Sequence, residues 1–455
     1  FPGDPALAWA GSGLNRTLLA GQDSLAASVL SDSTADGITD WWYLWATLVA
    51  GRHPAYTVRW VPWSDANQDQ GAPVVIQAGP LGDRYLTFTA STAFNWQLPA
   101  PAGAGPVDLD VSRRVALDDW TPATQNVLCA RWPGINGQNS WWFDVETNGV
   151  LELIWSPDGT TSNTAQSTVA PTVVDGAKLW VRAQLDVDNG AGAYTVNFFT
   201  SPPTDGATWT QLGATVTGLL TTTLFDPGST IAYTIGSRGT SGSPMSGKSY
   251  ETRIRSGLNG GVILPELDEL WQPFSTGSNN LAGPSGSPIL TFFASAQSGQ
   301  GLAYLSDATR LPKLLPLCGT RMVVLATSHN DGFSMNGLPS YTDLLLSEWA
   351  AWITAVKARA PEAAVVVATE NPETAGTTPN PDLRIRACRI RREMLLPFAA
   401  QQAAPALDAW QAFLDSSGNV VTSFIAADGV HPTATGPGDG MHLWASYADN
   451  ALGNP

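Results

Sequence analysis

Cysteine is scarce in this chain of 455 residues. Cys129, Cys318 and Cys388 are far apart in the sequence, with no Cys-x-x-Cys pair and no histidine at metal-ligand spacing. A disulfide framework and a zinc site both require such groupings. We therefore expect the three thiols to be buried small apolar groups, and the sequence predicts no metal site and no cofactor.

Positive charge is scarce as well, because 23 Lys and Arg stand against 39 Asp and Glu, a net charge of −16. A field of this sign disfavours nucleic acid and anionic membrane as partners. The longest apolar run, 41–51, is about half of what a bilayer span requires, so the sequence predicts a soluble protein without a membrane span. The chain opens on Phe1 rather than Met, which is compatible with a fragment or a processed product.

Buried strands and amphipathic helices alternate in the first and last parts of the chain. Continuous β-branched and aromatic runs are typical of parallel strands that are covered on both faces. Strands are expected at 17–20, 288–295, 321–327 and 363–369, and helices at 39–50, 345–356, 382–402 and after Pro437. This alternation predicts an α/β fold with a doubly wound, flavodoxin-like parallel sheet, whose ligands bind beyond the carboxyl ends of the strands.

Residues 86–283 follow a different pattern. Apolar and polar residues alternate with period two, and turn signals such as Asn148-Gly149, Asp158-Gly159 and Asn189-Gly190 recur every ten or so residues. That pattern is typical of an antiparallel β-sandwich. The sequence thus predicts an α/β domain in two parts, 1–85 and 284–455, interrupted by an all-β insertion at 86–283.

A candidate catalytic set is spread over the two ends of the chain. A serine is a weak nucleophile until an imidazole accepts its proton, and a carboxylate orients that imidazole. Asp428 and His431 are three residues apart and can share one loop, and Ser24 follows the apolar run at 17–20. The prediction is that Ser24 meets His431 at the rim of the parallel sheet.

Four short segments together resemble the sequence blocks of the SGNH hydrolases, also called GDSL esterases. They are Gly21–Leu25, Ser298–Leu302, Ser328–Asp331 and Asp428–Pro432. The chain departs from the family pattern at Gln22, which is interposed before Asp23, and at Ser328, which takes the place of a glycine. No Gly-x-Ser-x-Gly is present, which argues against the α/β-hydrolase elbow.

The resemblance implies a role for each matched residue. Ser24 would be the nucleophile, His431 the general base and Asp428 its orienting carboxylate. The oxyanion hole would consist of the backbone N–H groups of Ser24 and Gly299 and the side-chain amide of Asn330. Gln22, Asp23 and His329 are candidate pocket residues, although a non-catalytic role is favoured for His329, and no cofactor and no metal are expected.

The insertion resembles concanavalin A-like, laminin-G type sandwiches. SGNH domains interrupted in this way resemble tail or receptor-binding proteins of bacteriophages, which implies an extracellular, virion-tail location. The implied partners are acylated cell-surface polysaccharides or glycolipids and other tail proteins.

Exposed tryptophans such as Trp132, Trp141 and Trp142 could stack on sugars, although the core is the commoner place for tryptophan. The segment 186–190 faintly resembles a calcium loop, but a hairpin turn is favoured.

Two functions of different classes follow. The first is a serine esterase that removes O-acyl groups from bacterial surface glycans or glycolipids. The second is a non-catalytic, carbohydrate-binding adhesin or structural tail protein with a degenerate hydrolase domain. Only the substitutions at Gln22 and Ser328 favour the second, because an eroded site is expected to lose its Ser, His or Asn first.

Overall fold

The computed structural model describes most of the chain as two compact units. The described residues are 5–20, 24–66, 68–90, 96–98, 108–204, 206, 208–228, 231–238, 242–258, 285–316, 319–326, 342–377 and 381–452. The first unit joins the two ends of the chain, Phe1–Pro80 and Pro288–Pro455, and the second is Leu81–Ser287. The division lies within a few residues of the predicted insertion, 86–283.

The first unit is built on a mixed sheet with strand order β21-β20-β19-β1-β18-β2-β3 and with β4 beside β2. Neighbours from β21 to β2 pair in parallel, whereas β3 and β4 are antiparallel to β2. The strands are β1 (Leu25–Ser31), β2 (Thr57–Ser64), β3 (Asp69–Gln70), β4 (Val74–Gln77), β18 (Ile289–Ala296), β19 (Thr320–Ala326), β20 (Ala364–Ala368) and β21 (Ala406–Leu407). Consequently β1 lies between β18 and β19, in the middle of the parallel part.

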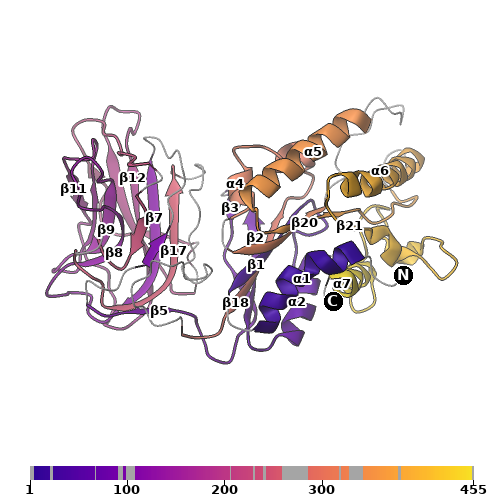
Figure 1. Ribbon diagram of the computed structural model, residues 1–455, viewed down its shortest axis with the longest axis horizontal. Coiled ribbons are helices and arrows are strands. Elements are labelled where there is room, and N and C mark those ends of the chain that lie inside the picture. Colours follow the sequence, from indigo (N-terminus) through magenta and orange to yellow (C-terminus); the bar gives the residue numbers. More distant parts are fainter. Residues whose placement is uncertain are drawn as a thin grey trace. The chain divides into compact units, whose positions relative to one another are not determined.

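Helices cover both faces of this sheet (Figure 1). One face packs on α1 (Pro5–Ala20), α2 (Trp41–Arg52) and α7 (Gly440–Leu452), and the other on α3 (Leu302–Leu305), α4 (Leu311–Leu314), α5 (Thr342–Arg359) and α6 (Pro381–Gln401). Successive strand residues point to opposite faces, so Val324 packs in the core with Trp45 while Val323 packs in the core with Trp349. This layering explains why the strands read as continuous apolar runs. Two 3₁₀ helices, Ala409–Phe413 and Thr422–Phe424, lie between β21 and α7.

The predicted strand at 17–20 is wrong, because these residues form the last turn of α1. Leu7, Leu14 and Leu18 are buried at helical spacing, so the short apolar run continues the buried face of a longer helix. The first strand is β1, which begins at Leu25. The other predicted strands and helices of this unit lie within a few residues of observed elements. The strands and α-helices that were not predicted are α1, β1, β2, β3, β4, α3, α4 and β21.

The second unit has only antiparallel pairing among its described strands. One sheet has the order β11-β10-β9-β8-β16-β6, and the other has β14-β13-β12-β7-β17-β5 with β15 beside β13. The strands are β5 (Leu86–Phe88), β6 (Trp96–Leu98), β7 (Leu109–Leu117), β8 (Asn126–Arg131), β9 (Trp141–Val145), β10 (Leu151–Trp155), β11 (Asn163–Gln166), β12 (Leu179–Asp186), β13 (Thr195–Ser201), β14 (Thr210–Gln211), β15 (Val216–Thr217), β16 (Tyr233–Ile235) and β17 (Gly247–Ser256). The turn signals at 148–149, 158–159 and 189–190 each connect an antiparallel pair, as predicted.

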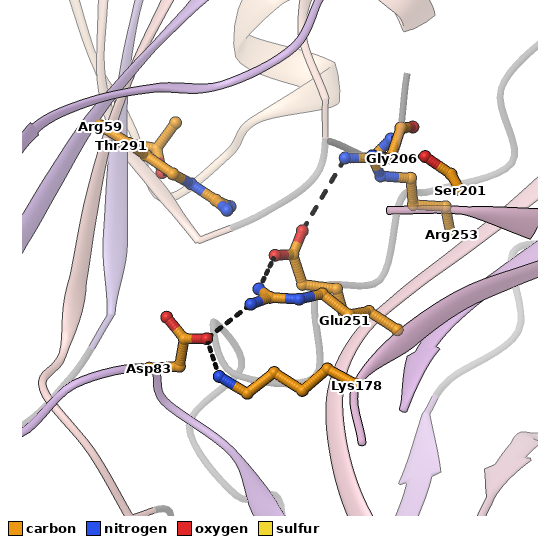
Figure 2. Close-up of polar contacts among 9 residues, drawn as sticks. Arg59, Asp83, Lys178, Ser201, Gly206, Glu251, Arg253 and Thr291 are labelled. Carbon is orange, nitrogen blue, oxygen red and sulfur yellow. Dashed lines mark hydrogen bonds and ion pairs between the residues drawn. The ribbon is translucent and has the colours of Figure 1, made fainter. Parts of the chain in front are cut away.

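Charged side chains link strands of the seven-stranded sheet (Figure 2). The carboxylate of Asp83 lies 2.6 Å from both Arg114 and Lys178, and Arg114 also lies 3.1 Å from Glu251. Although partial burial raises the pKa of Asp83, the two cations outweigh it and lower that pKa below its usual value. The network therefore links Asp83, in the segment before β5, to β7 and β17.

Candidate active site

His431 and Asp428 form a hydrogen-bonded pair on the loop that precedes α7. His431 Nδ1 lies 2.6 Å from Asp428 Oδ2. The other carboxylate oxygen, Oδ1, accepts the backbone N–H groups of Val430 and His431. Partial burial raises the pKa of Asp428, but the hydrogen bonds from His431 and from the two amides outweigh it and lower the pKa below its usual value. An ionised carboxylate only accepts, so His431 Nδ1 carries a hydrogen, and in the neutral form of the imidazole Nε2 is the acceptor.

The hydroxyl beside this imidazole belongs to Ser33. Ser33 Oγ lies 2.8 Å from His431 Nε2, across 398 residues of sequence. Ser33 follows the carboxyl end of β1 by two residues. The order hydroxyl, imidazole, carboxylate is the arrangement that activates a serine nucleophile.

A tight turn after β1 presents Ser33. Asp32 is fully buried, and its Oδ1 accepts both the backbone N–H and the hydroxyl of Thr34 at 3.1 Å. The N–H of Ala35 in turn bonds the carbonyl of Asp32. Because these bonds engage the residues on both sides of it, Ser33 is held at the end of the strand with its hydroxyl toward His431.

Ser24 does not take the position predicted for it. It precedes β1, and its Oγ accepts the backbone N–H of Ile289, the first residue of β18, at 2.9 Å. Ser24 thus lies at the amino ends of these parallel strands, and the seven residues of β1, which span about 23 Å, separate it from the rim that holds His431. The structure corrects the serine beside His431 from Ser24 to Ser33.

The sequence does contain a signal for Ser33. Residues 31–34, Ser-Asp-Ser-Thr, resemble the Gly-Asp-Ser block with Ser31 in the glycine position, and they follow the apolar run 25–30 directly. The strand predicted at 17–20 favoured the earlier Asp-Ser pair at 23–24, because that pair follows 17–20 closely. A longer apolar run is the better mark of a buried strand, and it precedes Ser33.

Gly299 lies beside the turn that holds Ser33. It follows β18, and the N–H of Gln297 donates to the carbonyl of Ser31 at 3.2 Å, which joins the loops after β18 and β1. Gly299 has φ +76°, and a Cβ added to it would meet no atom within 4 Å. The space that a side chain at this position would enter is therefore open. Asn330, His329, Gln22 and Asp23 lie outside the described residues.

The segment that follows β20 forms hydrogen bonds with the loop that carries His431. Asn371 is fully buried, and its Nδ2 donates to the carbonyl of Val430 at 2.7 Å. The backbone N–H of Thr374 bonds the carbonyl of Gly429 at 2.8 Å. Gly429 has φ +79°, and a Cβ there would lie 2.5 Å from the N of Gly376, so this position requires glycine. The imidazole therefore projects from a loop that is bonded to the parallel sheet.

Two further carboxyl groups lie near the pair. Burial, followed by the charge of Asp40, raises the pKa of Asp36 to about 7. Burial also raises the pKa of Asp40, although the charge of His431 acts in the opposite direction. Asp40 Oδ2 accepts the N–H of Gly37 at 2.6 Å. Near neutral pH the two groups are expected to share protons beside the imidazole.

Replacing Asp36 by Asn is expected to flatten the dependence of thermal stability on pH. A carboxyl group whose pKa is higher in the folded protein binds its proton more tightly there, so the stability that the proton confers is full below the unfolded-state pKa of about 4 and is gone above about 7. Thermal melts at intervals from pH 4 to 8 measure the effect. A melting curve for Asp36→Asn that falls in parallel with the wild type over this range contradicts the assignment.

Other predicted residues have positions outside this site. Cys129 and Cys388 are buried, as expected, and Cys318 lies outside the described residues. Among the described residues, the group of three acidic side chains close enough to share a cation is in the second unit, at Asp144, Glu146 and Glu152. The helices of the described residues include none that is long and apolar enough to cross a membrane.

No family model and no curated protein matches this chain. Solved structures that are similar include a peptidoglycan O-acetylesterase, at 12% identity, 98% of this chain, 96% of that chain and a TM-score of 0.39. A GDSL-like lipase from Bacteroides thetaiotaomicron matches at 18% identity, 36% of this chain, 75% of that chain and a TM-score of 0.27. Phospholipase A1 from Streptomyces albidoflavus matches at 22% identity, 34% of this chain, 79% of that chain and a TM-score of 0.25. With TM-scores below 0.5, these likenesses establish neither an activity nor a substrate for this chain.

Proposed function

We propose that the chain is a serine hydrolase of carboxylic esters in which Ser33, His431 and Asp428 form the catalytic triad. The observation that carries this proposal is the continuous hydrogen-bonded path from Ser33 Oγ through His431 to Asp428, with distances of 2.8 and 2.6 Å. Both distances lie within the reach required for proton transfer to a general base.

Each residue has a defined step in the proposed reaction. His431 Nε2 takes the proton of Ser33 while Oγ forms a bond to the ester carbonyl carbon, which gives a tetrahedral oxyanion. The protonated imidazole then gives its proton to the leaving alcohol, and an acyl-serine is left. Water, activated by the same imidazole, attacks the acyl carbon, and Ser33 regains its proton as the carboxylic acid departs.

The oxyanion needs donors where its charge develops. The backbone N–H groups of Ser33 and Gly299 are proposed for this role, because the loops that carry them are bonded to one another at the same rim. Asn330 is proposed as the third donor on the resemblance of residues 328–331 to the family block. Asp428 stays ionised throughout and stabilises the imidazolium form of His431.

The proposed substrates are O-acyl esters of bacterial cell-surface glycans or glycolipids. An open site supports a polymeric substrate, since the side chains of His431 and Asp428 are 41% and 38% exposed. A laminin-G type insertion, a phage-tail location and contact with other tail proteins belong to this proposal through the sequence resemblance alone. The doubly wound arrangement belongs to it through the predicted alternation of strands and helices. The residues of the proposed triad lie together, which supports an esterase over a degenerate hydrolase domain.

A fluorophosphonate probe tests the proposed nucleophile. The probe is expected to modify Ser33 of the native chain, because only a serine activated by an adjacent base attacks it readily. Digestion and peptide mass spectrometry locate the modified residue, and Ser24→Ala serves as the matched control that should still be labelled. Modification at Ser24, or labelling that persists in Ser33→Ala, contradicts the proposal.

A further inference from the structure

Three carboxylates meet on the six-stranded sheet of the second unit. Asp144 on β9 lies directly opposite Glu152 on β10, and Glu146 follows the end of β9. One carboxylate oxygen of each residue lies within 4.8 Å of the others. The cluster is separate from the triad, which belongs to the first unit.

One oxygen of this cluster is buried without any hydrogen-bond partner. Asp144 is fully buried, its Oδ2 accepts the indole N–H of Trp142 at 2.8 Å, and its Oδ1 has no partner at all. A buried, unpaired carboxylate oxygen is strongly unfavourable, because it has lost water and gained nothing in return. Asp144 Oδ1 is therefore available to bind a ligand in a cluster that also contains Glu146 and Glu152.

The surrounding side chains only partly balance the charge. Glu152 is buried, and its Oε2 accepts from the amide of Gln166 at 2.7 Å. The guanidinium of Arg238 lies 4.7 Å from the ring centroid of Trp142 and acts on Asp144 through its charge. When all three groups are ionised, the guanidinium of Arg238 offsets only part of their charge.

In the absence of a cation, two carboxyl groups of the cluster hold their protons more tightly than exposed ones do. Burial, followed by the charge of Glu152, raises the pKa of Asp144 well above its usual value. Burial also raises the pKa of Glu152 to about 7, and Glu146 adds to the shift.

We propose that Asp144, Glu146 and Glu152 bind a calcium ion. Ca²⁺ takes six to eight oxygen ligands at about 2.4 Å, so two of its ligands can be at most about 4.8 Å apart, and the three carboxylates meet that limit. Mg²⁺ needs shorter bonds and a near-ideal octahedron, which a flat sheet face with two opposed carboxylates does not offer. Glu146 is half-buried and gives the ion access to solvent and to water ligands.

The loop at 186–190 does not compete for this role. Asp186 Oδ1 accepts the N–H of Asp188, and Asp188 Oδ1 accepts the N–H of Gly190, both at 3.1 Å. The loop joins the antiparallel strands β12 and β13. Its carboxylates therefore stabilise a hairpin turn, as the sequence predicts, and Asp188→Asn is a matched control for substitutions in the cluster.

Terbium luminescence tests the proposal on the full chain. Tb³⁺ binds in calcium sites and emits when a neighbouring indole absorbs light, and the indole of Trp142 is bonded to Asp144. Protein that has been treated with chelator and dialysed is expected to show sensitised Tb³⁺ emission that Ca²⁺ displaces. Asp144→Asn and Glu146→Gln should each weaken Tb³⁺ affinity at least tenfold, while Asp188→Asn leaves it unchanged.

Thermal melting supplies a second readout. Addition of Ca²⁺ at about a hundredfold over its Kd is expected to raise the melting temperature of the wild type by about 5–10 °C, with no such rise in Asp144→Asn.

Equal melting temperatures with chelator and with Ca²⁺, together with absent Tb³⁺ emission, would mean that the cluster only shares protons, and the proposal would then be wrong. Displacement of Tb³⁺ by Mg²⁺ better than by Ca²⁺, or loss of emission in Asp188→Asn, would overturn it as well. Hydrolysis of small esters is expected to persist in chelator, because the triad contains no ligand of this site.

Discussion

Replacement of Ser33 by Ala is expected to lower kcat for p-nitrophenyl acetate by about 10⁴–10⁶-fold. The substitution removes the atom that forms the acyl intermediate, and loss of a catalytic serine in enzymes of this chemistry has effects of this size. Ser33 is half-buried and its hydroxyl bonds His431, so removal of one oxygen atom should leave the fold intact. Initial rates on purified protein, with the melting temperature measured in parallel, test this expectation.

The matched control is Ser24→Ala. This change removes the acceptor for the Ile289 N–H and is expected to lower stability slightly, but kcat should stay within about tenfold of the wild type, because Ser24 lies at the opposite ends of the strands. A collapse of activity in Ser24→Ala, with Ser33→Ala still active, would restore Ser24 as the nucleophile and refute the assignment of Ser33.

Replacement of Asp428 by Asn is expected to reduce kcat by about 10⁴-fold, as substitutions of the orienting carboxylate do in serine hydrolases. An amide in this position can donate to Nδ1, which would place the imidazole hydrogen on Nε2 and leave Ser33 without a base. The loss should be seen in kcat more than in KM, since Asp428 acts through His431. Steady-state kinetics with p-nitrophenyl acetate separate the two constants.

A second histidine–aspartate pair supplies the control for this prediction. His442 Nδ1 lies 2.9 Å from Asp439 Oδ1, with the same three-residue spacing as the proposed catalytic pair. Asp439 also accepts the N–H groups of Gly436 and His442 at the start of α7. Asp439→Asn is expected to lower the melting temperature and to keep kcat near the wild-type value. Equal losses of kcat in Asp428→Asn and Asp439→Asn would indicate a structural cause and contradict the triad.

The sequence alone was sufficient to predict the two kinds of structure in this chain. Period-two segments with regular turn signals marked the antiparallel unit, and apolar runs with helices marked the parallel sheet, because both patterns depend on which neighbouring side chains are buried. The short run at 17–20 was the exception. A run of four residues is too short to show either helical or strand periodicity. Only the spacing of Leu7, Leu14 and Leu18 identifies the helix to which the run belongs.

Local spacing also predicted the pairing of Asp428 with His431, since a separation of three residues allows the two side chains to share one loop. Only the tertiary structure decided which serine faces His431, because a contact across 398 residues depends on the direction of β1 and on its place between β18 and β19. The same holds for Asp144 and Glu152, which meet through the register of two antiparallel strands. A one-residue change of register would turn one of them to the opposite face of the sheet, and no spacing in the sequence reports that register.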